Sequence, residues 1–185
     1  MKKFMMIAAL MVATLSASAQ NEVGQITLKP TVGINLANIT GDGDHKMKVG
    51  VVAGAEAEYG ITAKLGLTCG LLYSMEGYKV DDTKFNLDYL NIPILAQYYV
   101  IPGLAVKAGL QPAFNVRHKV SYDGNTADLE GVKGFNFSIP VGLSYEYQSF
   151  VLDARYNIGV TKLYKDADQG RNNTISITLG YKFSL

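Results

Sequence analysis

Ionised side chains recur within apolar stretches of this 185-residue chain, at the polar positions of a two-residue alternation. Since a lone charge in a dry interior is costly, a balanced set of such charges predicts mutual neutralisation by ion pairs. We expect Arg155 to contact Glu56, Glu58 or Glu146. Eight of the ionised residues are Lys29, Glu56, Glu58, Lys107, Glu146, Asp153, Arg155 and Lys182, and Glu76 and Arg117, nearer to segment ends, complete a set of five acids and five bases.

A second set of residues, His118 with Ser121 and Glu130, combines a base, a hydroxyl group and an acid in one part of the sequence. A hydrolase would need such groups within hydrogen-bond reach of one another. Nothing in their spacing brings these three together, and histidine and serine are common in loops. We therefore interpret them, like His45, as loop residues, and predict no catalytic site and no cofactor.

Aspartates form two further groups, Asp81 and Asp82 with Asp88, and Asp166 with Asp168. Carboxylate oxygens are suitable ligands for a divalent cation, but this spacing fits no known ligand loop. We predict solvated acids and no metal site. The sequence Gly-Asp-Gly-Asp at 41–44 indicates a turn rather than a phosphate cradle, because no helix follows to supply an anion-binding N-terminus.

The elements that position the ionised residues are eight segments with two-residue alternation. Such alternation predicts β-strands with one apolar and one polar face. Each segment is about as long as a tilted strand that crosses a bilayer, roughly 9 to 11 residues. The predicted strands are 26–36, 49–61, 65–75, 90–100, 104–116, 135–147, 150–158 and 175–185, and none of their apolar faces carries a charge.

Alternation alone fits a soluble barrel as well as a transmembrane one, and two further patterns favour the membrane. Tyrosine and phenylalanine gather at both ends of the apolar faces, as bilayer interfaces would select. Short and long connections alternate, as in outer-membrane barrels. The short ones are 62–64, 101–103 and 148–149, and the long ones are 38–48, 77–88, 118–134 and 161–173.

These patterns predict an all-β protein, an eight-stranded antiparallel up-and-down transmembrane β-barrel with short periplasmic turns and long external loops. We expect the first and last strands to pair and close the barrel, because an open edge in hydrocarbon would leave backbone groups unpaired. Pro30, Pro93, Pro112 and Pro140 lie inside predicted strands. Since proline removes a ladder donor, we expect bulges or shortened pairing there.

Residues 1–20 have the composition of a secretory signal peptide: Lys2 and Lys3, an apolar run, and small residues at Ala17 and Ala19. We predict two parts, a signal peptide over 1–20 and an outer-membrane barrel domain over 21–185, exported in a Gram-negative envelope. Removing the two lysines from the 17 Lys and Arg leaves 15 against 16 Asp and Glu, which disfavours nucleic acid as a partner. The single cysteine, Cys69, can form no internal disulfide.

Several short motifs resemble the small PorT-like, "porin family" outer-membrane β-barrel domain, in order over essentially the whole mature chain. The resemblance implies a barrel in the outer membrane and no catalytic residues, and it accounts for an apolar-proline step at Pro93. The chain ends in Ser184-Leu185 rather than in an aromatic residue, which leaves open whether Phe183 serves as the barrel-assembly signal. The motifs are Val32–Leu36, Leu71–Ser74 with Gly77, Asp88–Pro93, Arg155–Gly159 and Leu179–Phe183.

An eight-stranded barrel is only just wide enough for its own side chains, so we expect paired charges to fill its lumen. The function we favour is a structural and interaction role through the external loops. Outer-membrane lipid would surround the barrel, and envelope proteins, secretion proteins or an external ligand would be its partners. A narrow porin-like channel for small solutes, an accessory barrel of a protein secretion system and a lipid-modifying enzyme are the alternatives. The loops name no ligand, and the oligomeric state stays open.

Overall fold

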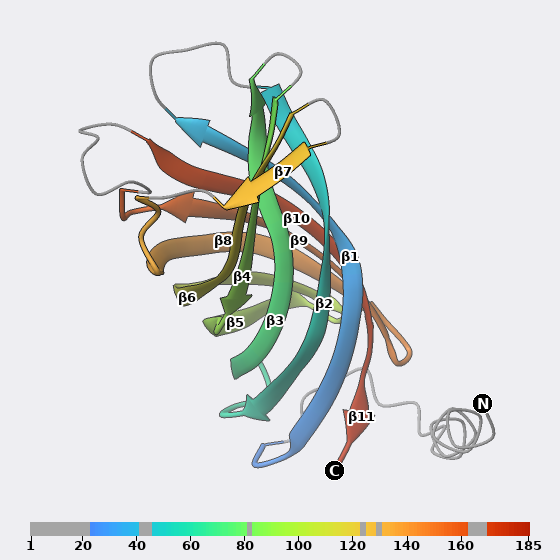
Figure 1. Ribbon diagram of the computed structural model, residues 1–185. Helices are drawn as coiled ribbons and strands as arrows, with labels where there is room; N and C mark the ends of the chain where they lie inside the picture. The colour runs from blue at the N-terminus through green and yellow to red at the C-terminus, as the bar shows by residue number, and fades with distance from the viewer. Residues whose placement is uncertain (1–22, 41–45, 81–82, 123–124, 129–130, 163–169) are drawn as a thin grey trace, which may run out of the picture.

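The computed structural model describes residues 23–40, 46–80, 83–122, 125–128, 131–162 and 170–185. Within these ranges the chain forms one antiparallel sheet that closes into a barrel (Figure 1). The sheet contains eight barrel strands, and its first and last strands pair from Thr31 opposite Gly180 to Thr40 opposite Arg171. The prediction of an eight-stranded barrel closed by its two terminal strands is confirmed.

Eleven strand segments make up the eight barrel strands, because β4 and β5 form one strand, β10 and β11 form the last, and β7 is a short addition to β6. No helix among the described residues is long and apolar enough to cross a membrane. The segments are β1 (Ile26–Thr40), β2 (Lys46–Gly60), β3 (Leu65–Val80), β4 (Thr83–Asn91), β5 (Ile94–Ile101), β6 (Leu104–Tyr122), β7 (Asn125–Asp128), β8 (Phe135–Tyr147), β9 (Phe150–Gly159), β10 (Arg171–Tyr181) and β11 (Phe183–Ser184).

All four prolines inside the predicted strands lie where strand pairing is interrupted or shortened, as predicted. Pro93 lies in the break between β4 and β5. Pro30 lies where β1 changes partner from β10 to β11, and Pro140 lies opposite a gap in the pairing of β8 with β6. Proline lacks the backbone N–H, so the ladder loses a donor at each of these positions.

At Pro112 the pairing is shortened on one side of β6 only, since β6 pairs with β4 up to Ala113 and with β5 from Leu110. Pro112 keeps its register position opposite Phe137, and its carbonyl accepts a hydrogen bond of 2.9 Å from the Ile92 N–H. Proline retains its acceptor, so a position that needs only the carbonyl can stay in the ladder. The register shifts of the sheet occur elsewhere, between Met47 and Val52, Asp88 and Tyr89, and Tyr99 and Ile101.

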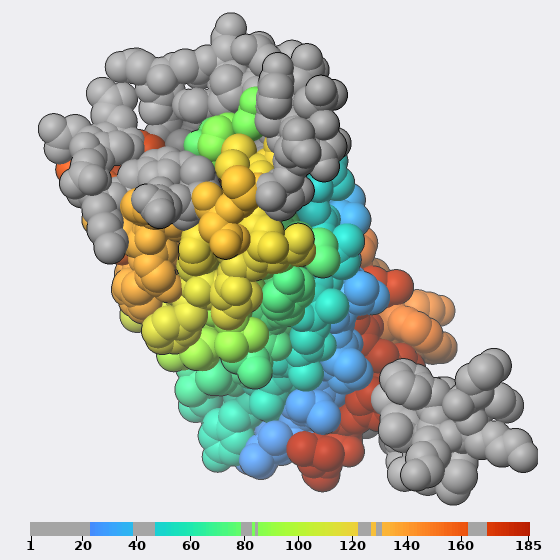
Figure 2. Space-filling model, viewed as in Figure 1, coloured from blue at the N-terminus to red at the C-terminus, as the bar shows by residue number. Residues whose placement is uncertain are grey.

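Exposure alternates along the strands, with apolar residues on the outer surface and polar residues in the lumen. Along β9 every second residue is buried from Val151 to Gly159, and the residues between them, such as Leu152, are exposed. Cys69 is likewise exposed. Figure 2 shows the outer surface of β1, β2 and β3 as a continuous wall. A bilayer-facing barrel requires this orientation, which is the reverse of a soluble one.

The connections at one end of the barrel, the loop end, are shorter than predicted because the strands continue past their expected ends. Val80 pairs with Thr83, so most of the predicted loop 77–88 is a β-hairpin. β6 continues to Tyr122, and β7 pairs with it inside the predicted loop 118–134. Pairing satisfies backbone N–H and C=O groups that a loop would leave to water. In Figure 1, β3 and β7 rise at this end, opposite the C-terminus.

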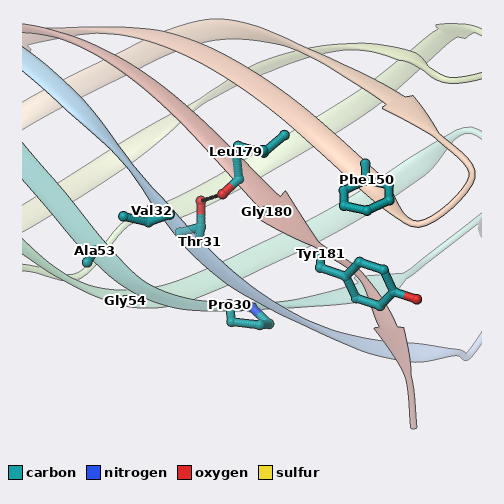
Figure 3. Close-up of a pocket in the computed structure, with 9 residues that line it drawn as sticks. All are labelled: Pro30, Thr31, Val32, Ala53, Gly54, Phe150, Leu179, Gly180 and Tyr181. Carbon is teal, nitrogen blue, oxygen red and sulfur yellow. Dashed lines mark hydrogen bonds between the residues drawn. The ribbon is translucent and has the colours of Figure 1, made fainter. Parts of the chain in front are cut away.

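The other end, the turn end, carries the three short connections and the C-terminal segment β11. Phe183 begins β11, opposite Leu28 of β1. On the outer surface near this end, a shallow pocket of about 420 Å³ crosses the seam between β1 and β10 (Figure 3). Its lining combines small residues, Ala53 and Gly180 among them, with Phe150 and Tyr181. The pocket lies outside the lumen, on the surface that faces lipid.

Candidate functional site

The candidate site is the lumen, because the polar faces of all barrel strands converge there. The eight residues predicted to pair are all nearly inaccessible, from 1% exposure at Glu56 to 9% for the Lys182 side chain. They form two clusters at different heights in the barrel. Strand alternation places each of them inside, since any inward residue is flanked by two outward ones.

The first group, the central cluster, contains Lys29, Glu56, Lys107, Asp153 and Arg155. Arg155 donates to both oxygens of Glu56, at 2.5 and 2.8 Å, and its Nε donates to Asp153 Oδ1 at 2.6 Å. Lys29 Nζ lies 2.7 Å from Glu56 Oε2, and Lys107 Nζ lies 2.6 Å from Asp153 Oδ2. The bidentate contact of a guanidinium with a carboxylate is the strongest common form of ion pair.

The second group, the turn-side cluster, contains Glu58, Gln97, Tyr99, Glu146 and Lys182. Lys182 Nζ lies 3.1 Å from Glu58 Oε2 and 3.0 Å from Glu146 Oε2. The Tyr99 hydroxyl donates to Glu58 at 3.0 Å and accepts from Lys182 at 3.2 Å. Gln97 Nε2 donates to Glu58 at 3.1 Å. These residues come from β2, β5, β8 and the last barrel strand, so alternate strands around the whole barrel meet at one hydroxyl group.

The formal charges of the two clusters are complementary. The central cluster has three cations and two carboxylates, and the turn-side cluster has one cation and two carboxylates. Their sum is zero. Burying charges is costly unless partners and hydrogen bonds satisfy them, and here each carboxylate contacts at least one cation. The arrangement places fixed, mutually neutral groups across the lumen.

Glu76 differs from the other interior acids, because no cation among the described residues pairs with its carboxylate. Ser74 donates to its Oε1 at 2.6 Å and Asn91 donates at 3.3 Å. Asn172 and Thr174 donate to its Oε2. Neutral amides and hydroxyl groups therefore solvate this carboxylate in the half of the lumen nearest the loop end. We call Ser74, Glu76, Asn91, Asn172 and Thr174 the amide cluster.

Arg117 does not face the lumen, contrary to our expectation. Its side chain is 51% exposed, and its Nη1 lies 3.6 Å from Asp88 Oδ2, which also accepts from the Tyr73 hydroxyl at 2.6 Å. The cause is the register shift between Asp88 and Tyr89, where β6 contains one extra residue. An extra residue reverses the face of every following position.

An apolar group lies in the lumen near the loop end, mostly on the neighbouring strands β3, β4 and β6. Tyr78 and Phe85 stack with ring centroids 4.4 Å apart, and Leu87 and Tyr89 beside them have no exposed surface. The group was not predicted from the sequence, because three of its residues, Tyr78, Phe85 and Leu87, lie in the segment 77–88, which was expected to be a loop. We call it the apolar cap, and its residues are Tyr78, Phe85, Leu87, Tyr89, Ala113 and Val132.

Other missed residues were recognisable in part. Tyr99 lies at one of the alternate positions that form the polar face of its strand, as Gln97 does. An aromatic residue on a polar face can be recognised from the sequence. Asn172 and Thr174 had a weaker signal, because the predicted strand began only at residue 175, whereas β10 begins at Arg171.

The groups of residues considered as possible catalytic or metal-binding sites at the loop end do not form a site among the described residues. His118 Nδ1 lies 3.0 Å from Asn115 Oδ1, and Ser121 accepts from Asn86 at 3.3 Å. Three positions along a strand place His118 and Ser121 on opposite faces. Asp88 is part of β4 and contacts Tyr73. His45, Glu130, the segment 41–44, Asp81, Asp82, Asp166 and Asp168 lie outside the described residues.

Comparison with solved structures shows the same fold in small outer-membrane proteins. Ail of Yersinia pestis, in complex with the heparin analogue sucrose octasulfate, has a TM-score of 0.59 and 17% identity, over 88% of this chain and 100% of that chain. Neisserial surface protein A has a TM-score of 0.61 and 16% identity, over 84% and 97%. Ail in a phospholipid nanodisc has a TM-score of 0.51 and 16% identity, over 86% and 99%.

No curated protein matches the chain in sequence. A family comparison does match: residues 18–165 fit the family described as the outer membrane protein beta-barrel domain. The match spans most of the chain and includes β1 to β9. The fold, the polar lumen and the apolar outer surface agree with it. The chain therefore belongs to the outer membrane protein β-barrel domain family.

Proposed function

We propose that the protein is an integral outer-membrane barrel with a side-chain-filled lumen, which acts through its loop end in a structural or interaction role. In this proposal residues 1–20 are a cleaved signal peptide, the turn end faces the periplasm and the loop end faces outward. The observation that carries the proposal is the turn-side cluster. Tyr99 accepts from Lys182 at 3.2 Å and donates to Glu58 and Glu146 at 3.0 and 3.3 Å, across the full section of the barrel.

The central cluster supports the same conclusion one layer higher. Lys107 on β6 and Lys29 on β1, which are on opposite sides of the barrel, both lie within ion-pair distance of Asp153, at 2.6 and 3.8 Å. The apolar cap adds a third layer at the loop end. A lumen occupied at three heights favours a closed barrel over the alternative of a narrow porin-like channel.

Conductance in a planar bilayer tests this proposal. The purified protein should give no steady conductance. Tyr99→Ala removes the side chain at which the strands meet and should give small current steps, whereas Tyr98→Ala on the same strand, which is 48% exposed on the outer surface, should not. A steady conductance of the unmodified protein comparable with that of a large porin would contradict the proposal.

Processing and location need a separate test. Mass measurement of the protein isolated from outer membranes should give a chain that begins after Ala19 or Gln20. On a denaturing gel the unheated protein should migrate differently from the heated one, because small barrels resist unfolding. An unprocessed chain, or a single unshifted band in a soluble fraction, would refute the assignment.

The interaction partner is open to direct measurement. The neighbour Ail was solved with a heparin analogue, so a sulfated saccharide is the first external ligand to test at the loop end. The PorT-like resemblance makes a role in secretion the second candidate. Deleting the gene and measuring secreted proteins tests that role, and unchanged secretion would exclude it.

A further inference from the structure

Charged surface residues are distributed unequally between the two ends of the barrel. At the loop end, five basic side chains outside the lumen are at least partly exposed among the residues whose side chains the structure describes: Arg117, Lys119, Lys133, Lys162 and Arg171. We call these five residues the basic collar. At the turn end, Lys64 is the exposed charged side chain among the described residues. The exposed charged side chains at the loop end are mostly basic, since Asp128 is the exposed acid there within the described ranges.

The collar lies just beyond the apolar outer surface. Phe114 and Phe135 form an edge-on aromatic pair with centroids 5.6 Å apart, and they are 46% and 45% exposed. Arg117 follows Phe114 by three positions on β6, and Lys133 precedes Phe135 by two. At the rise of a β-strand, these spacings are roughly 7 to 10 Å along the chain. Aromatic residues mark the interface of a bilayer, so the collar lies in the polar layer immediately outside it.

The register of the strands concentrates this charge. Lys162 and Arg171 are directly opposed in an isolated bridge, although like charges in opposed positions destabilise a sheet. Register also brings Lys79 of β3 opposite both Lys46 of β2 and Lys84 of β4, which extends the row of basic positions along the sheet.

The acids of this end have a different place in the sequence. They belong to the connections beyond the strand ends and lie outside the described residues, whereas the collar belongs to the strands and the positions next to them. These acids are Asp42, Asp44, Asp81, Asp82, Asp123, Glu130, Asp166 and Asp168.

We propose that the basic collar binds the phosphate groups of anionic lipid headgroups in the leaflet around the loop end. Arginine binds phosphate in a bidentate manner, and clusters of Lys and Arg at a membrane surface recognise anionic headgroups. Position favours a lipid over a soluble anion, because the collar adjoins the aromatic residues rather than the tips of the connections. The proposal rests on the proposed orientation for the identity of that leaflet.

The test measures lipid binding by the purified mature protein in neutral detergent, using native mass spectrometry. The probes are lipid A with two phosphates and the same lipid without phosphate. The collar variants are the double substitutions Arg117→Gln/Lys119→Gln and Lys133→Gln/Arg171→Gln. The matched control, Lys64→Gln/Ser149→Glu at the turn end, changes the net charge by the same amount.

Each collar variant should weaken binding of the diphosphorylated lipid about 30-fold, since each basic residue near an anionic surface contributes a factor of about five. The control should change it less than about twofold. Equal losses in collar and control variants would reduce the effect to net charge and overturn the proposal. Equal binding of both lipids, or competition by inositol hexakisphosphate as strong as by the lipid, would overturn it as well.

Conductance of the same variants separates this proposal from the proposed function. The collar lies outside the lumen, so all variants should remain non-conducting and heat-modifiable. Equal binding of the two lipids by an unmodified protein that does not conduct would refute the collar alone, and conductance in the unmodified protein would refute the closed lumen alone.

Discussion

The two halves of the lumen hold buried charge in different ways. In the half nearest the turn end, four cations and four carboxylates neutralise one another in the central and turn-side clusters. In the half nearest the loop end, Glu76 is a single carboxylate held by neutral donors from Ser74, Asn91 and Asn172. In the first half, ion pairs offset the lost hydration of the buried charges. In the second half, hydrogen bonds from neutral amide and hydroxyl groups offset the lost hydration of the carboxylate.

The difference predicts how each half responds to substitution. Removing one member of a buried ion pair leaves the other charge uncompensated, which costs several kcal/mol. Replacing a carboxylate among neutral donors by an amide of the same shape leaves no isolated charge behind. Stability should therefore fall steeply on the paired side and gently on the dipolar side.

The largest effect is expected for Arg155→Met. This change leaves Glu56 with Lys29 alone and removes two contacts of Asp153, so the free energy of unfolding should fall by about 3 to 5 kcal/mol. Urea unfolding in lipid vesicles, followed by the gel-shifted folded band, measures it. Arg171→Met, which is exposed, serves as the control. A loss below about 1 kcal/mol for Arg155→Met would contradict the ion-pair interpretation.

A smaller loss is expected for Lys182→Met in the turn-side cluster. Hydrogen bonds to charged groups contribute about 1.5 to 3 kcal/mol, and Lys182 retains some access to solvent. Adding Glu146→Gln should recover part of the loss, because it removes one of the carboxylates left unpaired. A double-mutant cycle on these two residues should give a coupling free energy of about 0.5 to 3 kcal/mol. Purely additive losses would show that the two side chains act independently.

Glu76→Gln should cost less, about 1 kcal/mol, since its partners are neutral and Asn172 can rotate its amide to match. Glu76→Ala should cost more than Glu76→Gln, because it leaves the donors of the amide cluster unsatisfied. The same urea experiment measures both. If Glu76→Gln were as damaging as Arg155→Met, the contrast between the two halves would be wrong.

The smallest effect is expected for His118→Ala at the loop end. His118 is exposed and contacts Asn115. Surface substitutions of this kind change stability by about 0.5 kcal/mol or less. This variant provides the baseline for the other three, and a loss above 1 kcal/mol would place an unrecognised structural contact at the loop end.

The sequence predicted the strands most accurately inside the bilayer, where the two faces of a strand meet different surroundings. Alternation is enforced there, since an outward residue meets lipid and an inward one meets the lumen. Beyond the bilayer both faces can meet water, so alternation fades. The predicted strands therefore ended at Met75 and Val116, whereas β3 and β6 continue to Val80 and Tyr122.

The candidate site was predictable in composition but not in its pairs. The alternation of apolar and polar positions identified which ionised residues share the inner face. It failed at Arg117, where one extra residue in β6 reversed the face. A bulge of this kind has no clear signature in the residues around Val116. The alternation also could not select among Glu56, Glu58 and Glu146 as partners of Arg155, because each lies on an inward face.

By itself, the sequence determined the two-faced strands, their number and the apolar outer surface, because a two-residue period follows directly from strand geometry. Tertiary structure decided which inward side chains meet. Arg155 and Glu56 are 99 positions apart and are joined by barrel closure. The stagger between strands sets the height of each residue in the lumen, and that stagger is a property of the closed sheet rather than of any one strand.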